Sequence, residues 1–138
     1  MGCDIHIVLE KKVHETEWLG LYCTDDLPSR RPVFAQRNYD FFAALANVRG
    51  RGDNYPRGLP SDISRLAWLK FSECPTDNHS SSNMALSEFI EIWKTSIFEK
   101  EPFYSDELGI RANYIEYDLF QLHAEPDDQY RVVFWFDN

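Results

Sequence analysis

The chain has 138 residues, of which 43% are hydrophobic and 15% aromatic, and this predicts one folded domain over residues 1–138 rather than a disordered chain. Its formal net charge is −9, and an acidic surface repels phosphate groups, so general nucleic-acid binding is disfavoured. No apolar run approaches the length of a membrane span, and the three cysteines form no CxxC pair, which favours reduced thiols in a cytoplasm.

The first 23 residues predict a β-hairpin. Residues 3–12 alternate as a strand does, so that successive side chains point to opposite faces. One face is apolar, with Cys3, Ile5, Ile7 and Leu9. The other face carries Asp4, His6, Val8 and Glu10. A short polar turn separates this strand from a second predicted strand over residues 18–23.

Three helices are predicted in the middle of the chain. The first covers residues 37–50, with Asn38 or Asp40 as its cap. The second covers residues 61–71, capped by Ser61 or Asp62. Its predicted inward residues are Ile63, Leu66, Ala67 and Leu69. The third covers residues 84–100 and carries an apolar stripe, while residues 72–83 are predicted to be a polar loop.

The period changes to strand-like alternation near the C-terminus. Residues 114–125 and 130–138 predict a second hairpin, although a helix over residues 113–122 also fits. The last strand is apolar on both faces, which predicts a central position beside the first strand. The order of elements therefore predicts an α+β fold: a single antiparallel sheet of about four strands, from N-terminal and C-terminal hairpins, backed on one face by about three helices.

Several motifs together resemble a family of small proteins encoded by tailed bacteriophages. The motifs are MGCDIH at Met1–His6, RNYDFFAALANVRG at Arg37–Gly50, RGLPSDIS at Arg57–Ser64, DNH at Asp77–His79 and VVFWFDN at Val132–Asn138. Phe42 stands where the family pattern has Leu. The resemblance implies a phage-encoded accessory protein that acts in the cytoplasm of the infected bacterium, and it implies no particular reaction.

Two Asp-x-His pairs are candidates for a metal or acid–base site. Asp4 and His6 project from the same strand face, and Asp77 and His79 lie in the predicted loop. If the pairs converge, their four side chains suit Zn²⁺, Mn²⁺ or Fe²⁺, and His6 and His79 suit acid–base catalysis. The alternative is that Asp4 and His6 form the wet face of an edge strand and that His79 is an ordinary surface histidine.

Arginine is concentrated in the middle of the chain. Seven arginines and three aspartates lie between Arg30 and Arg65, although the whole chain is acidic. Arg49, Arg51 and Arg57 fall in an irregular glycine-rich loop, and arginine suits bidentate contact with phosphate or carboxylate. The loop is therefore a candidate anion site, while ordinary ion pairing with the acidic remainder is the alternative.

Trp135 is expected to line the same site if its strand neighbours the first strand and its side chain shares the face of His6. The cysteines suggest no nucleophile, since Cys3 falls on the apolar face of its strand, as a core residue does, and Cys74 has no evident base nearby.

Two functions fit these observations. In the first, Asp4 and His6 form the floor of a polar pocket, and the loops around Arg49–Arg57 and Asp77–His79 form its walls. The pocket binds an anionic small molecule such as a nucleotide, with or without a divalent metal and hydrolysis of the ligand. In the second, the chain is a non-catalytic acidic protein that binds and inhibits a host protein, for example a defence protein.

Overall fold

The fold is built on one antiparallel sheet with the strand order β2-β1-β4-β3. The computed structural model describes residues 2–26, 35, 37–50, 54–73, 76–98 and 129–137. The four strands are β1 (Asp4–His14), β2 (Glu17–Cys23), β3 (Asn78–Ala85) and β4 (Tyr130–Asp137). The predicted α+β class, with four antiparallel strands and three helices, is confirmed.

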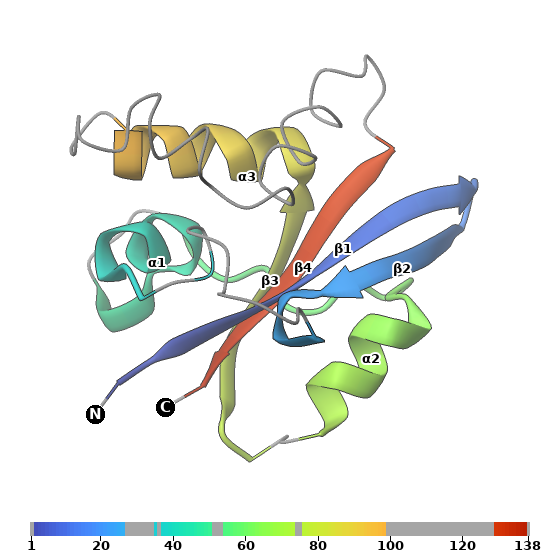
Figure 1. Cartoon of the computed structure of the whole chain (residues 1–138), viewed down its shortest axis with the longest axis horizontal. Coiled ribbons are helices and arrows are strands. Elements are labelled where there is room, and N and C mark those ends of the chain that lie inside the picture. The colour runs from blue at the N-terminus through green and yellow to red at the C-terminus, as the bar shows by residue number, and fades with distance from the viewer. Residues whose placement is uncertain are drawn as a thin grey trace.

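The first and last strands pair as predicted. β1 lies between β2 and β4, and its register with β4 runs from Asp4 opposite Asp137 to Lys11 opposite Tyr130. β4 is buried along almost its whole length, which agrees with its apolar residues on both faces and its central position. The two ends of the chain consequently lie close together (Figure 1).

The fourth strand is not the one that the sequence suggested. β3 occupies residues 78–83, which were predicted to be a polar loop, and residues 84–85, which were predicted to begin the third helix. It pairs with β4 along the edge opposite β1. β4 is therefore hydrogen-bonded to β1 on one side and to β3 on the other. Because neither edge of β4 is left for a hairpin partner, the predicted C-terminal hairpin is wrong. Residues 114–125, its other predicted strand, lie outside the described residues. The outer edge of β3 is in turn covered, since Gly58 N donates to Ser81 O at 2.8 Å.

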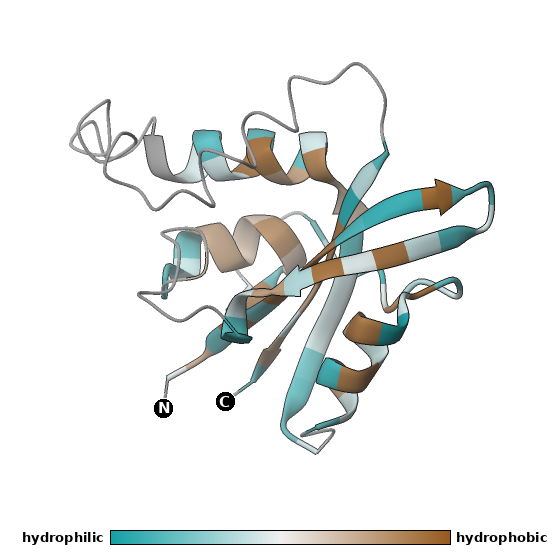
Figure 2. Ribbon diagram, turned by 45° about the vertical axis from the view of Figure 1, so that its right-hand side comes forward, coloured by the Kyte–Doolittle hydropathy of each residue, from teal (hydrophilic) through white to brown (hydrophobic). Residues whose placement is uncertain are grey.

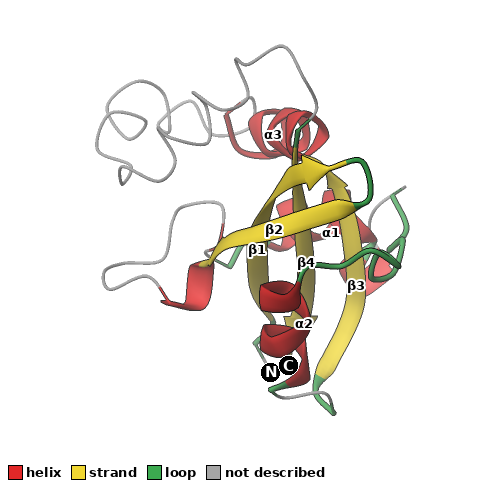
Figure 3. Cartoon of the chain, turned by 90° about the vertical axis from the view of Figure 1, so that its right-hand side faces the viewer, coloured by secondary structure: helices red, strands yellow, loops and turns green. Residues whose placement is uncertain are grey.

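Helices cover both faces of the sheet, so the prediction of helices on one face is wrong. α1 (Tyr39–Ala46) and α3 (Leu86–Trp93) pack on one face, and α2 (Arg65–Ser72) packs on the other (Figures 1 and 3). A second layer is needed because Val8, Val133 and Trp135 are apolar on the face that carries His6. Burying these side chains removes apolar surface from water only if a helix covers them.

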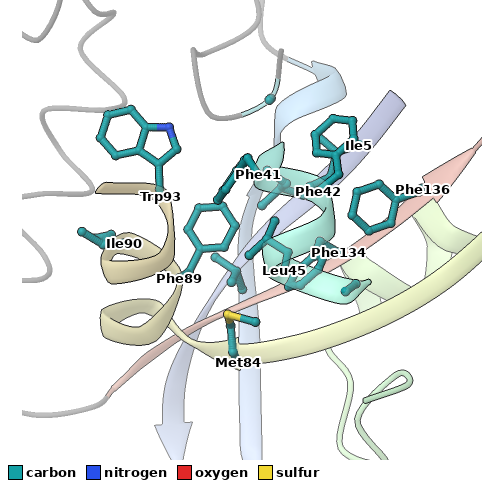
Figure 4. Packing of buried hydrophobic residues seen from close by; sticks show 14 of the residues in the cluster. Ile5, Phe41, Phe42, Leu45, Met84, Phe89, Ile90, Trp93, Phe134 and Phe136 are labelled. Carbon is teal, nitrogen blue, oxygen red and sulfur yellow. The ribbon is translucent and has the colours of Figure 1, made fainter. Parts of the chain in front are cut away.

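The larger core fills the space between the sheet and the α1–α3 layer. It is rich in aromatic rings, such as Phe41 against Phe89 and Phe42 against Phe136, with ring centroids 5.5 and 5.0 Å apart (Figure 4). The side of α3 that carries Phe89 and Trp93 faces this core, and the hydrophobic and hydrophilic bands of α3 alternate along its length (Figure 2).

The helix ends follow ordinary capping chemistry. Asn38 caps α1 as predicted, and its side chain accepts from Phe41 N. α2 begins later than predicted, because Ser64 rather than Ser61 or Asp62 is its cap. Leu69, predicted to point inward, is 52% exposed, because the helix turns its buried side toward Ala67 instead.

A buried ion pair anchors the start of α2 to the sheet. Glu10 on β1 is fully buried, and Arg131, directly opposite it on β4, donates to its carboxylate. The second Glu10 oxygen accepts from Ser64 N at 2.7 Å. Arg131 also donates to Asp62 at 2.7 Å, so three separate segments meet at one charged network. Such a network satisfies a buried carboxylate that would otherwise be costly.

Candidate functional site

Polar side chains gather where β1 begins, β4 ends and β3 begins. The registers place Asp4 opposite Asp137, and Asn78 on the other side of Asp137. We call this region the terminal end of the sheet; it comprises residues 3–6, 78–80 and 135–137. Its two faces carry different chemistry because side chains alternate along each strand.

His6 is clamped between two carboxylates on the α2 face. Its Nδ1 lies 2.6 Å from Asp25 in the 3₁₀ turn Thr24–Asp26, and its Nε2 lies 2.8 Å from Asp137 on β4. A histidine that donates from both ring nitrogens is an imidazolium. Burial acts to lower the pKa of His6, but the hydrogen bonds to Asp25 and Asp137 outweigh it and raise the pKa above its usual value.

The indole ring of Trp135 packs against the imidazole ring of His6. The two rings stack with centroids 6.0 Å apart and an angle of 21° between their planes. Phe71 of α2 packs against Trp135 in a T-shaped arrangement, with ring centroids 5.4 Å apart. Trp135 therefore shares the face of His6, as expected. With only 2% of its surface exposed, it orients the imidazole rather than presenting a surface to a ligand.

Asp4 has a different partner from His6. Its two carboxylate oxygens accept from Arg37 Nε at 2.8 Å and Arg37 Nη2 at 3.2 Å. This is the bidentate geometry with which arginine holds oxyanions. Arg37 stays 55% exposed, and its guanidinium lies against Gly2.

The opposite face of the terminal end carries a thiol and a second imidazole. Cys3 Sγ lies 3.9 Å from His79 Nε2, and His79 Nδ1 lies 3.0 Å from Ser80 Oγ. The His79 ring stacks on Phe136 with centroids 6.1 Å apart. Ser80 has φ 53°, and the register of β3 shifts between His79 and Ser82. A bulge with left-handed backbone thus sets the direction of this imidazole.

Two guanidinium groups lie within electrostatic range of the Cys3 thiol. Burial raises the pKa of Cys3, and the negative charges of Asp137 and Asp4 raise it further, while the positive charges of Arg49 and Arg37 act to lower it. Arg49 lies 4.2 Å from the centre of the Tyr39 ring, and Tyr39 Oη accepts from Cys3 N at 3.4 Å. Arg37 and Arg49, which we call the arginine pair, therefore flank the start of β1.

The structure does not bring the two Asp-x-His pairs together. His6 pairs in register with Trp135 and His79 with Phe136, so the two histidines lie on opposite faces of the sheet. Asp77 is exposed in the turn that precedes β3. The predicted convergence of Asp4, His6, Asp77 and His79 is therefore wrong, and no group of three or more potential ligands within the described part of the chain could hold a metal ion.

The three loop arginines are likewise not assembled as predicted. Arg57 makes a bidentate ion pair with Glu88 of α3, while Arg49 stacks on Tyr39 of α1. Arg51 lies outside the described residues. Arg57 is thus an ion-pairing residue, in agreement with the alternative of ordinary ion pairing, and Arg49 has Arg37 rather than Arg57 as its neighbour at the thiol.

Sequence reasoning missed four residues of this region: Cys3, Asp25, Arg37 and Asp137. The alternation of the last strand could have revealed Asp137, because residues 131, 133, 135 and 137 share one face once β4 is paired with β1. Arg37 belongs to the arginine-rich stretch in the middle of the chain. No sequence signal places Asp25 beside His6 or His79 beside Cys3, since both contacts depend on register irregularities.

Comparison of the chain with protein-family models, with curated proteins and with solved structures finds no match. None of the described helices is long and apolar enough to cross a membrane.

Proposed function

We propose that the chain is a phage-encoded accessory protein that binds an anionic small molecule, such as a nucleotide, at the arginine pair in the cytoplasm of the infected bacterium. The motif resemblance supports the phage assignment. One observation carries the binding assignment: two accessible guanidinium groups, Arg37 and Arg49, flank the same strand end in an otherwise acidic protein. Guanidinium groups recognise phosphate and carboxylate oxygens through paired hydrogen bonds.

The Asp4–Arg37 contact supports this proposal rather than opposing it. Asp4 already places two carboxylate oxygens on Arg37, so the guanidinium is oriented for an oxyanion. An ion pair exposed to solvent contributes little to stability, so an incoming phosphate can share or replace Asp4 at small cost. Arg49 stacks on Tyr39, which holds its charged group near the backbone of Cys3.

Ligand-dependent thermal unfolding tests the proposal. Inorganic phosphate and adenine or guanine nucleotides should raise the melting temperature, since a ligand at 100 times its dissociation constant adds about 2.7 kcal/mol of stability. The double substitution Arg37→Ala/Arg49→Ala should abolish the shift. Arg57→Ala, which removes an arginine paired with Glu88, and Arg65→Ala, which removes an exposed arginine of α2, should keep it.

A second function, inhibition of a host protein, is favoured by one observation. Trp68 and Leu69 are adjacent on α2 and are 53% and 52% exposed. Large exposed apolar side chains are enriched where proteins bind one another. If this function operates, expression of the protein should impair bacterial growth, and Trp68→Ala should relieve the effect while Arg37→Ala/Arg49→Ala does not. If the anion-binding function operates, any effect of expression on bacterial growth should be relieved by Arg37→Ala/Arg49→Ala and not by Trp68→Ala.

A further inference from the structure

We propose that Cys3 and His79 form a nucleophile–base pair that transfers the phosphoryl group of a phosphate monoester held by the arginine pair. This inference rests on the proposed anion-binding function and names the chemistry of that site. It goes beyond a lone thiol because three groups are arranged in sequence: a sulfur, an imidazole 3.9 Å away, and a hydroxyl that orients the imidazole.

The imidazole is oriented for proton transfer. When His79 Nδ1–H donates to Ser80 Oγ at 3.0 Å, Nε2 is left as the acceptor that faces the sulfur. The stack on Phe136 fixes the plane of the ring. A separation of 3.9 Å is long for this contact, but catalytic hydrogen bonds are often long in the absence of substrate and tighten when it binds.

The surroundings of Cys3 explain why it needs a base. Burial raises the pKa of the Cys3 thiol, so the neutral thiol is its resting form. A neutral thiol attacks effectively only when a neighbouring group takes its proton. Arg49 and Arg37 supply positive charge near the sulfur, alongside the negative charges of Asp137 and Asp4, and the two guanidinium groups can stabilise the negative charge on a transferring phosphoryl group.

Access to the sulfur requires a local opening at the terminal end of the sheet. Cys3 is 1% exposed, but it precedes Asp4, the first residue of β1 that pairs with β4. Its amide donates to Tyr39 Oη over a long 3.4 Å contact. An opening at Cys3 leaves the paired residues of the β1–β4 register in place, so it costs less free energy than opening of the paired strand.

The proposed reaction has two balanced steps. Cys3 Sγ attacks phosphorus as His79 Nε2 takes the thiol proton; the P–O bond to the leaving group breaks, and the leaving oxygen receives that proton from His79. Water then attacks the phosphoryl group on sulfur as His79 takes its proton. The P–S bond breaks, phosphate leaves, and the proton of His79 returns to the Cys3 thiolate.

Site-resolved alkylation tests the pair without any substrate. The folded 138-residue chain is treated with iodoacetamide, and the modification of each cysteine is followed by peptide mass spectrometry. Cys23, buried and with its pKa raised to about 12, is the internal reference. Cys3 should react faster than Cys23 in the wild type. His79→Asn should slow the alkylation of Cys3 by about 100-fold, which is within the usual range for loss of a general base.

His14→Asn is the matched control, because His14 is an exposed histidine on the distal end of β1. It should leave the alkylation of Cys3 unchanged, and circular dichroism should show that each variant is folded. If Cys3 is alkylated at the same rate in the wild type and in His79→Asn, the proposed Cys3–His79 nucleophile–base pair is overturned. A Cys3 rate no higher than that of Cys23 would overturn it as well.

Turnover of p-nitrophenyl phosphate tests the substrate assignment. The wild type should release p-nitrophenol and, after an acid quench, should carry phosphate on Cys3. Cys3→Ser and Cys3→Ala should lose turnover but keep the phosphate-dependent rise in melting temperature, and His14→Asn should keep both. Phosphate binding without turnover would overturn phosphoryl transfer while the binding proposal stands. Absence of phosphate binding would overturn the binding proposal and the substrate together.

Discussion

His6 Nε2 lies 2.8 Å from Asp137, so the first and last strands are joined by a charged side-chain contact as well as by their backbone ladder. Asp25 holds the other side of the same ring at 2.6 Å. A single protonated imidazole thus links β1, β4 and the turn that follows β2. Its proton is part of what stabilises the terminal end of the sheet.

The stability of the protein should depend on pH through His6. The pKa of His6 is raised in the folded state above the ordinary value of 6.5. The protonated ring therefore favours folding, and its contribution is complete below pH 6.5 and is lost as the pH rises through the folded pKa. Urea unfolding between about pH 6 and about pH 9 should show that the free energy of unfolding falls with pH.

His6→Gln isolates this effect from other titrations. The difference in unfolding free energy between wild type and His6→Gln should shrink as the pH rises through the folded pKa of His6. If the free energy of unfolding of the wild type exceeds that of His6→Gln by an amount that grows with pH, the stabilisation of protonated His6 by Asp25 and Asp137 is contradicted.

Removing one carboxylate should lower the pKa of His6. Asp137→Asn keeps the shape of the side chain but removes its negative charge, so the imidazolium loses a charged acceptor. A titration of the His6 ring by NMR should show a lower pKa in Asp137→Asn than in the wild type, and Asp25→Asn should act in the same direction. An unchanged His6 pKa in both variants would show that the carboxylates do not hold the ring in solution.

Breaking the buried ion pair should be far more costly than breaking a surface pair. Arg131→Met leaves Glu10 fully buried without its charged partner and should lower the free energy of unfolding by about 3–5 kcal/mol. Lys70→Met breaks the solvent-accessible contact with Asp26 and should cost below about 1 kcal/mol. Chemical denaturation measures the free energy of unfolding of both variants. Similar decreases in Arg131→Met and Lys70→Met would contradict the claim that the Glu10–Arg131 pair is buried from solvent.

Gly20 should be required by the close packing of α2 on β2. A Cβ atom at Gly20 would lie 2.5 Å from Leu66 Cβ, so α2 must shift to accept one. Gly20→Ala should destabilise the fold by about 1–3 kcal/mol, as overpacking does. In the double variant Gly20→Ala/Leu66→Gly, the total loss should be smaller than the sum of the single losses, because the second substitution removes the Leu66 Cβ that obstructs the new methyl group. Strict additivity would contradict the close approach of Leu66 to Gly20.

The part of the fold that follows from side-chain alternation could be predicted. Ile5 and Val8 fall on opposite faces of β1, and the apolar stripe of α3 is buried, as the sequence indicated. β3 could not be recognised, because most of its residues are serine, asparagine and histidine and its strand conformation comes from pairing with β4. Intrinsic strand preference is weak compared with such tertiary context.

The candidate site was only partly predictable for a related reason. The shared face of His6 and Trp135 follows from the period of two strands and their pairing. The position of His79 could not be inferred because its strand was not recognised, and a bulge at Ser80 sets its direction. The local sequence pattern predicts which face of a strand each side chain occupies. Contacts between segments distant in the sequence depend on the register between strands, which the local pattern does not determine.

Calorimetric titration of adenosine monophosphate into the protein at low salt tests the central claim most directly. The wild type should bind saturably, and Arg57→Ala should bind with the same affinity because Arg57 contacts Ser82 of β3 and Glu88 of α3 rather than the start of β1. Arg37→Ala/Arg49→Ala should lose the binding while remaining folded. Absence of binding in the wild type, or equal binding in all three proteins, would contradict an anion site at the arginine pair.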